Sequence, residues 1–503
     1  MLKHLVPIAA LIATFIIAVP SITAEEIEAG TDMEARLSTP TGTRISHAGD
    51  PIEATVIAPI TLNGRLVVPQ GAIVSGTIEN VERLGLGLKH LTAEIEYRFD
   101  TLRLPDGMTV PIQARVFDVE TAKERVNAQG MIGGIYPTAN LSSSVALYTL
   151  QLLCVDPDFG IPMLGVKLLI ARSPDPEIYF PAGTEMVLQL TSSVDVPVEG
   201  VSQDRIAPLS AAEMAEARRI VSELPRQRTD NGRNRPSDLI NILFLGDRDS
   251  ISRAFHAAGW SGAQRSSLLT IYRIYHCMVQ RMGYGMAPMG KLTLNGLAAD
   301  AEYQKSLNTF SKRHHLRLWK QSDQDVWLGA ATEDTGYAFR RMHLTHATDP
   351  LIDNERTKVL NDLSFTGCVE GAELLTRDSV ENRGDQSPFS GTDGKIAVIR
   401  VNDCRVPHSP VFEAAKPGPH KQRRVVQALV ALENDIIRSN PISFASNTVR
   451  LLRENQRPRI SEVNSPLQTR NKRNADNSKS GTPARWIRPS VLDQTNTTVD
   501  AQR

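Results

Sequence analysis

The sequence predicts an α+β protein in which an all-β barrel or sandwich is followed by a mixed α/β domain and a disordered C-terminal tail. Residues 93–100 alternate strictly between apolar and polar side chains, which is typical of a strand with one buried face. Between residues 239 and 405 strand patterns and helix patterns intermix, which indicates a mixed domain. From Arg457 onward Asn, Ser, Arg and Pro dominate with few apolar residues, so we expect disorder there.

The first segment, residues 1–24, has the order of a secretory signal peptide. Lys3 and His4 precede an apolar run over residues 5–19, Pro20 interrupts the run, and small residues lead to Ala24. This order predicts an exported protein of the periplasm or cell envelope. The alternative is an uncleaved membrane anchor, although the run is shorter than the roughly 20 apolar residues of a spanning helix.

Residues 25–200 are predicted to form the β-barrel-like domain. Turn sequences separate its apolar runs, with Asn-Gly at 63–64 and Pro-Asp-Gly at 105–107. An Ala-Gly-Thr pattern starts two strand-like runs, at residues 29–33 and 182–186, and we interpret it as a strand start. A more apolar segment near 144–171 is predicted to be a helical insertion.

Residues 201–238 are predicted to be a helix and a linker. Ser210 and Glu213 have capping-box spacing for a helix over 210–224, and Arg, Asn, Asp and Pro dominate the following stretch to residue 238. The domain at 239–405 then begins with a buried strand at 240–245. Its other predicted elements are two helices, a hairpin and a last strand, at 249–258, 268–283, 314–331 and 395–401. Residues 406–503 are predicted to hold one amphipathic helix, at 421–439, and the disordered tail.

The four cysteines are Cys154, Cys277, Cys368 and Cys404. None forms a Cys-x-x-Cys pair, which excludes a zinc ribbon, and export permits disulfides. Cys368 and Cys404 both border strand-like segments, so they are the favoured pair. Four free, buried thiols are the alternative.

The first domain resembles the β-barrel domain of the TrbI-like scaffold proteins of type IV secretion systems. The resemblance runs through turns and strand starts, namely Ala29-Gly30-Thr31, Val68-Pro69-Gln70-Gly71-Ala72, Gly76, Arg98-Phe99, Leu104-Pro105-Asp106-Gly107 and Ala182-Gly183-Thr184. Such motifs specify a fold rather than an activity, so the resemblance implies a barrel.

The second domain resembles the LssY C-terminal domain family. The matching residues are 241–246, Ala257-Ala258-Gly259-Trp260, Tyr303-Gln304-Lys305, Arg313-His314-His315-Leu316-Arg317-Leu318-Trp319, Trp327-Leu328-Gly329-Ala330-Ala331, His346, Asp349-Pro350, Asp353, Glu355 and Arg356. In other proteins this domain is attached to membrane domains of the phosphatidic-acid-phosphatase type. The resemblance therefore implies an envelope setting and phospholipid-related work.

A cluster of polar residues in the second domain is the candidate site. Four of the eleven histidines fall between His314 and His346, among arginines and carboxylates that include Arg313 and Asp334. Imidazole and carboxylate groups suit a divalent metal with an activated water. Arginine and histidine also suit metal-free binding of a phosphate with acid–base chemistry.

On a strand, His314 and His315 face opposite sides. His314 shares the core-like side with Leu316 and Leu318, so a buried structural role is expected for it, and His315 is the candidate for the site. We predict catalytic roles for His315, Arg317, His346 and Asp349, and metal binding by His343, His346 and Asp349.

A structural interpretation competes with this site. Asp349 before Pro350 has the pattern of a helix N-cap, and Asp353 and Glu355 at the helix start favour its dipole. Arg356 can pair with one of these carboxylates. This interpretation explains the carboxylates without catalysis, but it leaves the four clustered histidines unexplained.

Charge and composition narrow the function. The 56 basic and 56 acidic residues cancel, so no global field attracts nucleic acid, and none is expected as a partner. We predict an exported binding or scaffold protein with an envelope component or a protein as partner, and with peripheral membrane contact. The alternative is a hydrolase that acts on a phosphorylated or lipid-linked substrate. The sequence does not decide whether the chain is an enzyme, and it leaves the cofactor open, with a divalent metal as the candidate.

Overall fold

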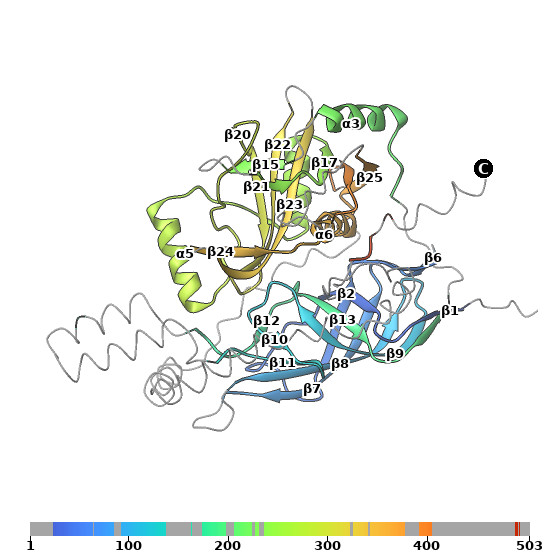
Figure 1. Cartoon of the computed structure of the whole chain (residues 1–503). Coiled ribbons are helices and arrows are strands. Elements are labelled where there is room, and N and C mark those ends of the chain that lie inside the picture. Colours follow the sequence, from blue (N-terminus) through green and yellow to red (C-terminus); the bar gives the residue numbers. More distant parts are fainter. Residues whose placement is uncertain are drawn as a thin grey trace, which may run out of the picture.

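The computed structural model describes residues 24–63, 65–84, 92–136, 162, 174–197, 206–223, 227–230, 236–321, 325–340, 343–377, 392–404, 488–490 and 492. They form two domains that lie against each other, one all-β and one mixed (Figure 1). Several predicted segments lie outside these residues: residues 1–23 of the signal peptide, nearly all of the helical insertion near 144–171, the amphipathic helix at 421–439 and most of the tail.

The first domain is a closed six-stranded β-barrel. Its strands follow the order β8, β7, β4, β2, β13 and β9, and β9 also pairs with β8. All neighbouring strands are antiparallel. The bounds are β2 (Asp32–Leu37), β4 (Pro51–Val56), β7 (Ile73–Glu82), β8 (Glu94–Arg103), β9 (Thr109–Val119) and β13 (Glu185–Leu190). The sequence left a barrel and a sandwich open, and the β8–β9 pairing makes the domain a barrel.

The local sequence explains how these strands are built. In β8 the alternating Ile95, Tyr97 and Phe99 are all buried and fill the barrel. The Ala-Gly-Thr pattern marks strand starts, as predicted. Gly30 and Gly183, each two residues before the start of β2 or β13, have φ angles of 86° and 90°, a conformation that suits glycine because it has no Cβ.

Short strands complete the first domain. β10 (Arg125–Val126) and β11 (Met131–Gly133) extend the barrel sheet beyond β8. Three antiparallel pairs stand beside it: β1 (Ala24–Ile27) with β14 (Val194–Pro197), β3 (Thr41–Gly42) with β12 (Tyr179–Phe180), and β5 (Ile60–Leu62) with β6 (Arg65–Val68).

The second domain is built on a mixed sheet in the order β18, β21, β22, β23, β17, β26 and β25, with β24 also paired to β23. Only β17 and β26 run parallel among these described pairs. The bounds are β17 (Ile242–Leu245), β18 (Ser261–Gly262), β21 (Ala301–Lys305), β22 (Lys312–Lys320), β23 (Val326–Arg340), β24 (His343–Thr348), β25 (Val369–Thr376) and β26 (Lys395–Val401). The predicted hairpin is confirmed as β22 and β23.

Two strands of a second, four-stranded sheet lie where a linker was predicted. β15 (Gln227–Asp230) pairs with β16 (Pro236–Leu239) and with β19 (Leu292–Leu294), which in turn pairs with β20 (Leu297–Ala298). Polar composition suggested a linker, but backbone pairing with β19 brings part of this stretch into the second domain.

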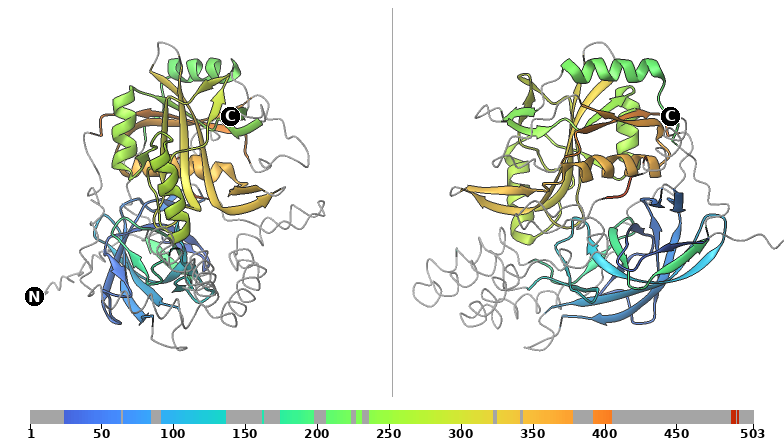
Figure 2. Two further views of the ribbon diagram at one scale, coloured as in Figure 1. Left: turned by 90° about the vertical axis from the view of Figure 1, so that its left-hand side faces the viewer. Right: turned by 45° about the vertical axis from the view of Figure 1, so that its right-hand side comes forward.

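The described residues contain four α-helices: α3 (Ala211–Glu223), α4 (Arg248–Ala257), α5 (Leu268–Gln280) and α6 (Ile352–Phe365). α4 and α6 pack on one face of the sheet and α3 packs on the other (Figure 2). The predicted capping box of α3 is present, because the Ser210 amide donates to the Glu213 carboxylate and the Glu213 amide donates to the Ser210 hydroxyl. Within the described ranges, none of these helices combines the length and apolar character that crossing a membrane requires.

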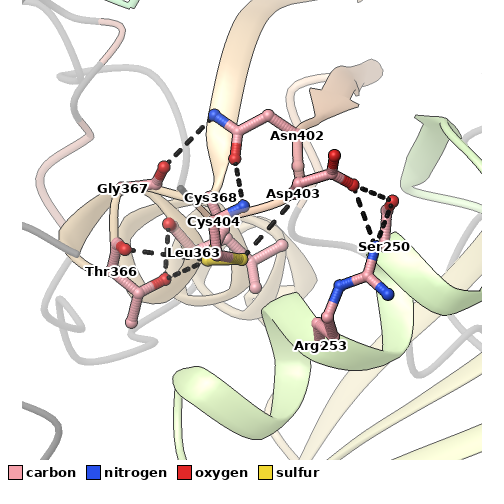
Figure 3. The surroundings of a disulfide bond; sticks show 9 residues. All are labelled: Ser250, Arg253, Leu363, Thr366, Gly367, Cys368, Asn402, Asp403 and Cys404. Atoms are coloured by element: carbon pink, nitrogen blue, oxygen red, sulfur yellow. Dashed lines mark hydrogen bonds and ion pairs between the residues drawn. A yellow bond between two sulfur atoms is a disulfide. The ribbon is translucent and has the colours of Figure 1, made fainter. Parts of the chain in front are cut away.

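The favoured disulfide is confirmed, because Cys368 and Cys404 are bonded to each other (Figure 3). It joins the turn after α6 to the end of β26. Beside it, the Asp403 carboxylate accepts hydrogen bonds from the Ser250 hydroxyl at 3.0 Å and the Arg253 guanidinium at 2.9 Å, which ties α4 to the same segment. Cys277 is a free thiol, and Cys154 lies outside the described residues.

Candidate functional site

Strand β22 carries chemistry on both faces. Leu316 and Leu318 point into the core under α4 and α6, while Trp319 belongs to the core on the α3 side. His314 and His315 therefore face opposite sides of the sheet, as the strand alternation predicts. Each histidine belongs to a different cluster of ionisable groups.

The cluster around His315 is centred on the Asp334 carboxylate. Arg313 Nε lies 3.0 Å from Oδ2, and His315 Nε2 lies 3.2 Å from Oδ1. His346 Nδ1 lies 3.3 Å from Oδ2. The strand register explains the convergence: Arg313 on β22 stands directly opposite Asp334 on β23, and β24 brings His346 alongside. We call Arg313, His315, Asp334 and His346 the outer cluster.

Electrostatics shift the pKa values of Asp334 and His346 in the outer cluster. Burial raises the pKa of the Asp334 carboxyl, but His315, His346 and Arg313 outweigh burial and keep that pKa well below its usual range. Burial lowers the pKa of His346 below its usual value, although Asp334 acts in the opposite direction. Asp334 is therefore a permanent anion near neutral pH, and a neutral His346 is favoured.

The ring of His315 is engaged at both ends. Its Nδ1 lies 2.8 Å from the Thr332 hydroxyl, while Nε2 faces Asp334. The His346 ring is packed edge-on against Phe310, and its side chain is 29% exposed, compared with 9% for His315. Of the two histidines, His346 is the one that solvent or a ligand can reach more easily.

The other predicted site residues lie in structural contacts. Arg317 bonds to Asp238 at 3.2 Å and to the Gly290 carbonyl at 3.0 Å. The Asp349 carboxylate accepts the Leu351 amide at 2.7 Å, so it closes a turn just before α6, whose N-cap position is Leu351. His343 lies in β24, but its side chain is outside the described residues, so the predicted metal set is not tested.

The structure therefore assembles His315 and His346 through two residues to which the sequence assigned no role, Arg313 and Asp334. Both stood in the histidine-rich stretch. The register of the β22–β23 hairpin would have identified them, because it places residue 313 opposite residue 334. This register can be derived from the sequence by pairing residues outward from the predicted turn.

The opposite face of β22 meets the barrel. On β2, Met33, Ala35 and Leu37 fill the barrel, so Glu34 and Arg36 point outward, yet both are buried. α6 covers Arg36, whose guanidinium lies 5.0 Å above the ring of Phe365 at the end of the helix, and Glu34 is bonded to Arg488. A second contact between the domains is made by Leu307 and Asn308, which bond to residues 121–124 of the barrel.

A buried ion network fills this domain interface. Lys358 Nζ on α6 lies 2.7 Å from Glu185, 2.9 Å from Asp362 and 3.6 Å from Glu120. Asp362 also accepts Lys305 at 3.0 Å and the Trp260 indole at 2.9 Å. The members come from both domains: Glu34, Arg36, Glu120 and Glu185 from the barrel; Lys305, His314, Glu333, Glu355, Lys358 and Asp362 from the second domain.

Part of the predicted disordered tail belongs to this network. Arg488 is buried between the domains and bonds to Glu34 at 2.6 Å and to Glu120 at 2.8 Å. Its backbone amide donates to Asn354 on α6, and Leu492 enters the core of the second domain. The expectation of a disordered tail therefore does not hold at residues 488–490 and 492, because two buried carboxylates bind the arginine.

His314 is committed to the same network. Its Nδ1 lies 2.8 Å from Glu355 and its Nε2 lies 3.4 Å from Glu120, and the ring is fully buried. Burial lowers the pKa of His314, but Glu355 and Glu120 outweigh burial and raise that pKa well above its usual value. The structure thus gives His314 the buried structural role expected for it, as an imidazolium between two carboxylates.

The network holds more carboxylates than cations. Six carboxyl groups face the basic side chains of Arg36, Lys305, Lys358 and Arg488 and the His314 imidazolium, so the carboxyl groups outnumber the basic groups by one. Burial raises the pKa of Glu34 and of Glu333 to about 7 in each case, so both carboxyls bind a proton more readily than an exposed glutamate does. Within the part of the chain that the structure describes, His314, Glu333 and Glu355 are the one trio with metal-binding spacing, although His314 is already held as a cation.

The fold and these clusters define a two-domain protein in which a six-stranded barrel is joined to a mixed α/β domain by buried ions. The second domain matches the family model described as LssY C-terminus over residues 221–396. A solved structure with similarity is that of ComB10 of the Com type IV secretion system of Helicobacter pylori, with 12% identity, a TM-score of 0.20, and coverage of 35% of this chain and 93% of that chain. No curated protein sequence matches the chain.

Proposed function

We propose that this chain is an exported cell-envelope protein that binds or holds an envelope component and does not turn over a substrate. The observation that carries the proposal is the buried ion network. His314, which belongs to the stretch Arg313–Trp319 that resembles the LssY family, is held there as a cation by two carboxylates that come from different domains. Buried ion pairs add little net stability but can specify one arrangement of the parts they join. A fixed two-domain platform suits a binding protein.

The outer cluster supports the same proposal. Asp334 already faces three cationic or imidazole partners, and both nitrogens of His315 have partners within the protein. Side chains that satisfy one another in this way stabilise the β22–β23–β24 sheet without any bound substrate.

The envelope setting rests on separate observations. The Cys368–Cys404 disulfide is of the kind that persists in oxidising compartments outside the cytosol. The first 24 residues have the order of an export signal. Resemblance to the LssY C-terminal family, whose domain is attached elsewhere to phosphatase-type membrane domains, also favours the envelope.

Sedimentation with envelope vesicles from the native host tests this proposal. We expect saturable binding by the purified chain, and equal binding by a His315→Ala, His346→Ala variant with an unchanged melting temperature. Neither protein should hydrolyse p-nitrophenyl phosphate or phosphatidic acid. Hydrolysis by the wild type that disappears in the folded double variant would overturn the proposal.

One observation favours a hydrolase as the second candidate. The two histidines proposed from the sequence for catalysis converge on one carboxylate, and a carboxylate that orients an imidazole is a recurring arrangement in acid–base catalysis. In this candidate Asp334→Asn should abolish phosphoester turnover, whereas Asp249→Asn on the exposed surface of α4 should not. A metal-dependent hydrolase requires bound metal in the wild type and loss of that metal in the variant His346→Ala, Asp349→Ala. Elemental analysis of the purified proteins measures the metal content.

A further inference from the structure

Helix α5 exposes an apolar stripe. Leu268, Ile271, Tyr272, Tyr275 and Met278 follow the spacing of one helix face, and their exposed fractions are 87%, 57%, 46%, 42% and 38%. Of the ten large hydrophobic side chains that are exposed among the described residues, eight lie between positions 268 and 286. Figure 1 places α5 at the outer edge of the second domain, apart from α3 and α6. The apolar face of this helix is therefore turned away from the core.

The stretch of sequence that carries this stripe is cationic. From Ser250 to Ala299 the sequence contains no Asp or Glu, in a chain with 56 acidic residues. The same stretch holds five Lys and Arg residues, and two of them, Arg265 and Arg273, are exposed at the start of α5 and along it. An apolar stripe with basic residues and no acidic residue is complementary to a surface that is itself apolar and negatively charged.

The helix is held in place at both ends. A capping box between Ser267 and Thr270 fixes its start. After its end the chain packs closely: a side chain at Gly283 would bring a Cβ within 2.4 Å of the Leu307 carbonyl oxygen, and the Tyr284 hydroxyl donates to Gln264 at 2.7 Å. The stripe is thus a feature of a fixed surface.

We propose that the exposed face of α5 docks on the surface of a lipid bilayer that contains anionic lipids. In this arrangement Leu268, Ile271 and Met278 enter the boundary between headgroups and acyl chains. The two tyrosines combine an apolar ring with a polar hydroxyl, which suits the same boundary, and the arginines bind lipid phosphates. The inference rests on the proposed function only for its envelope setting, and it names the lipid surface as the component that is bound.

Flotation with protein-free vesicles tests this inference. The purified full-length chain is mixed with vesicles of phosphatidylcholine alone or with phosphatidylglycerol added. We expect binding to the anionic vesicles that weakens as NaCl is raised, because salt screens the arginines. The variant Ile271→Glu, Tyr275→Glu should reduce the partition coefficient at least about tenfold, since it places two carboxylates in the boundary region. The variant Arg265→Gln, Arg273→Gln should bind several-fold more weakly.

A matched control adds the same two charges elsewhere. Ile45 and Leu297 are also exposed, at 41% and 70%, and neither belongs to α5. Ile45→Glu, Leu297→Glu should bind the vesicles like the wild type. The inference would be overturned if the control and the α5 variant lost vesicle binding equally, or if both retained it.

Two further outcomes separate the alternatives. A wild-type dimer in sedimentation velocity that Ile271→Glu, Tyr275→Glu dissociates, with no vesicle binding, would identify α5 as an interface between copies and refute lipid docking. Binding to native envelope vesicles without binding to protein-free vesicles would also refute lipid docking, yet it would leave the proposed function standing. If neither kind of vesicle binds the chain, both proposals fail.

Discussion

Lys358→Met tests whether the ion network joins the two domains. Lys358 is fully buried on α6, and its ammonium contacts carboxylates from both domains: Glu185 and Glu120 of the barrel and Asp362 of its own helix. Methionine keeps an unbranched apolar side chain of similar length but removes the charge. The variant therefore leaves three buried carboxylates without their central cation.

The magnitude follows from burial and from the partners that stay behind. Removing one partner of a buried ion pair costs about 3–5 kcal/mol, because the remaining charge has lost its compensation. Lys305 and Arg36 still contact Glu185 and Asp362 after the change, so we expect the lower end, about 3 kcal/mol.

Urea denaturation followed by far-UV circular dichroism and by tryptophan fluorescence measures this loss. Circular dichroism reports on both domains, whereas Trp260 donates to Asp362 and reports on the network. In the wild type we expect the two domains to unfold in one transition, and in Lys358→Met the transition should separate into two. Lys320→Met is the control: Lys320 is 39% exposed in its pair with Asp325, and such pairs contribute about 0–1 kcal/mol. A loss below about 1 kcal/mol in Lys358→Met, or no difference from the control, would refute the assigned role of the network.

Three further predictions concern pH, the disulfide and the outer cluster. Burial raises the pKa of Glu34 from 4.5 to about 7, so the folded protein binds a proton that the unfolded chain releases. This proton contributes about 3 kcal/mol to the free energy of unfolding. The contribution is complete below pH 4.5 and is lost as the pH rises through 7. Glu34→Gln should flatten the decline in unfolding free energy between pH 5 and 8, and an unchanged slope would contradict the assignment. The variant Cys368→Ala, Cys404→Ala opens a loop that spans 36 residues in sequence. In urea titrations it should lower the free energy of unfolding by about 2–4 kcal/mol. The wild type under reducing conditions should show the same loss, which serves as the check. Asp334→Asn removes the anion that raises the pKa of His346, so an NMR titration of that imidazole should show a lower pKa than in wild type; a higher value would rule out the described contact.

The features that the sequence predicted correctly depend on local patterns. The alternation in β8 and the turn glycines before β2 and β13 are set by neighbours within a few residues, and both were predictable. The Cys368–Cys404 pair was also predictable, because both cysteines border strands of the same domain. The opposite facings of His314 and His315 follow from strand geometry alone.

The ion network could not be predicted, because its members are far apart in sequence. Glu185 lies 173 residues from Lys358, and Arg488 lies 368 residues from Glu120. Without the domain packing, Glu34 and Arg36 have the pattern of a solvated strand face. α6 illustrates the same limit: nearly all of its residues are buried, including Lys358 and Asp362, although its sequence is rich in charges.

Helix α5 shows the reverse situation. The spacing of Leu268, Ile271, Tyr275 and Met278 predicted a helix correctly, and a helix with one apolar face normally packs on the core. In the fold, however, α6 with its charged residues is the buried helix and α5 with its apolar stripe is exposed. Periodicity identifies a helix but does not say which partner covers its apolar face. An exposed stripe of this kind on a rigid surface is itself an indication of binding.

The two unusual helices can be connected through the domain interface. If α6 fixes the barrel to the second domain through Lys358, a surface that binds α5 also fixes the position and orientation of the barrel relative to that surface. In a flexibly linked pair, docking of α5 would leave the barrel free to take many orientations. The network then has a role that stability alone does not require, since an apolar interface of the same size would hold the domains at least as strongly. Lys358→Met should therefore leave the affinity for anionic vesicles unchanged but broaden the distribution of distances between the barrel and the bilayer. Spin labels at an exposed barrel position would measure these distances. Equally narrow distances in the variant would mean that the interface is rigid without its central cation.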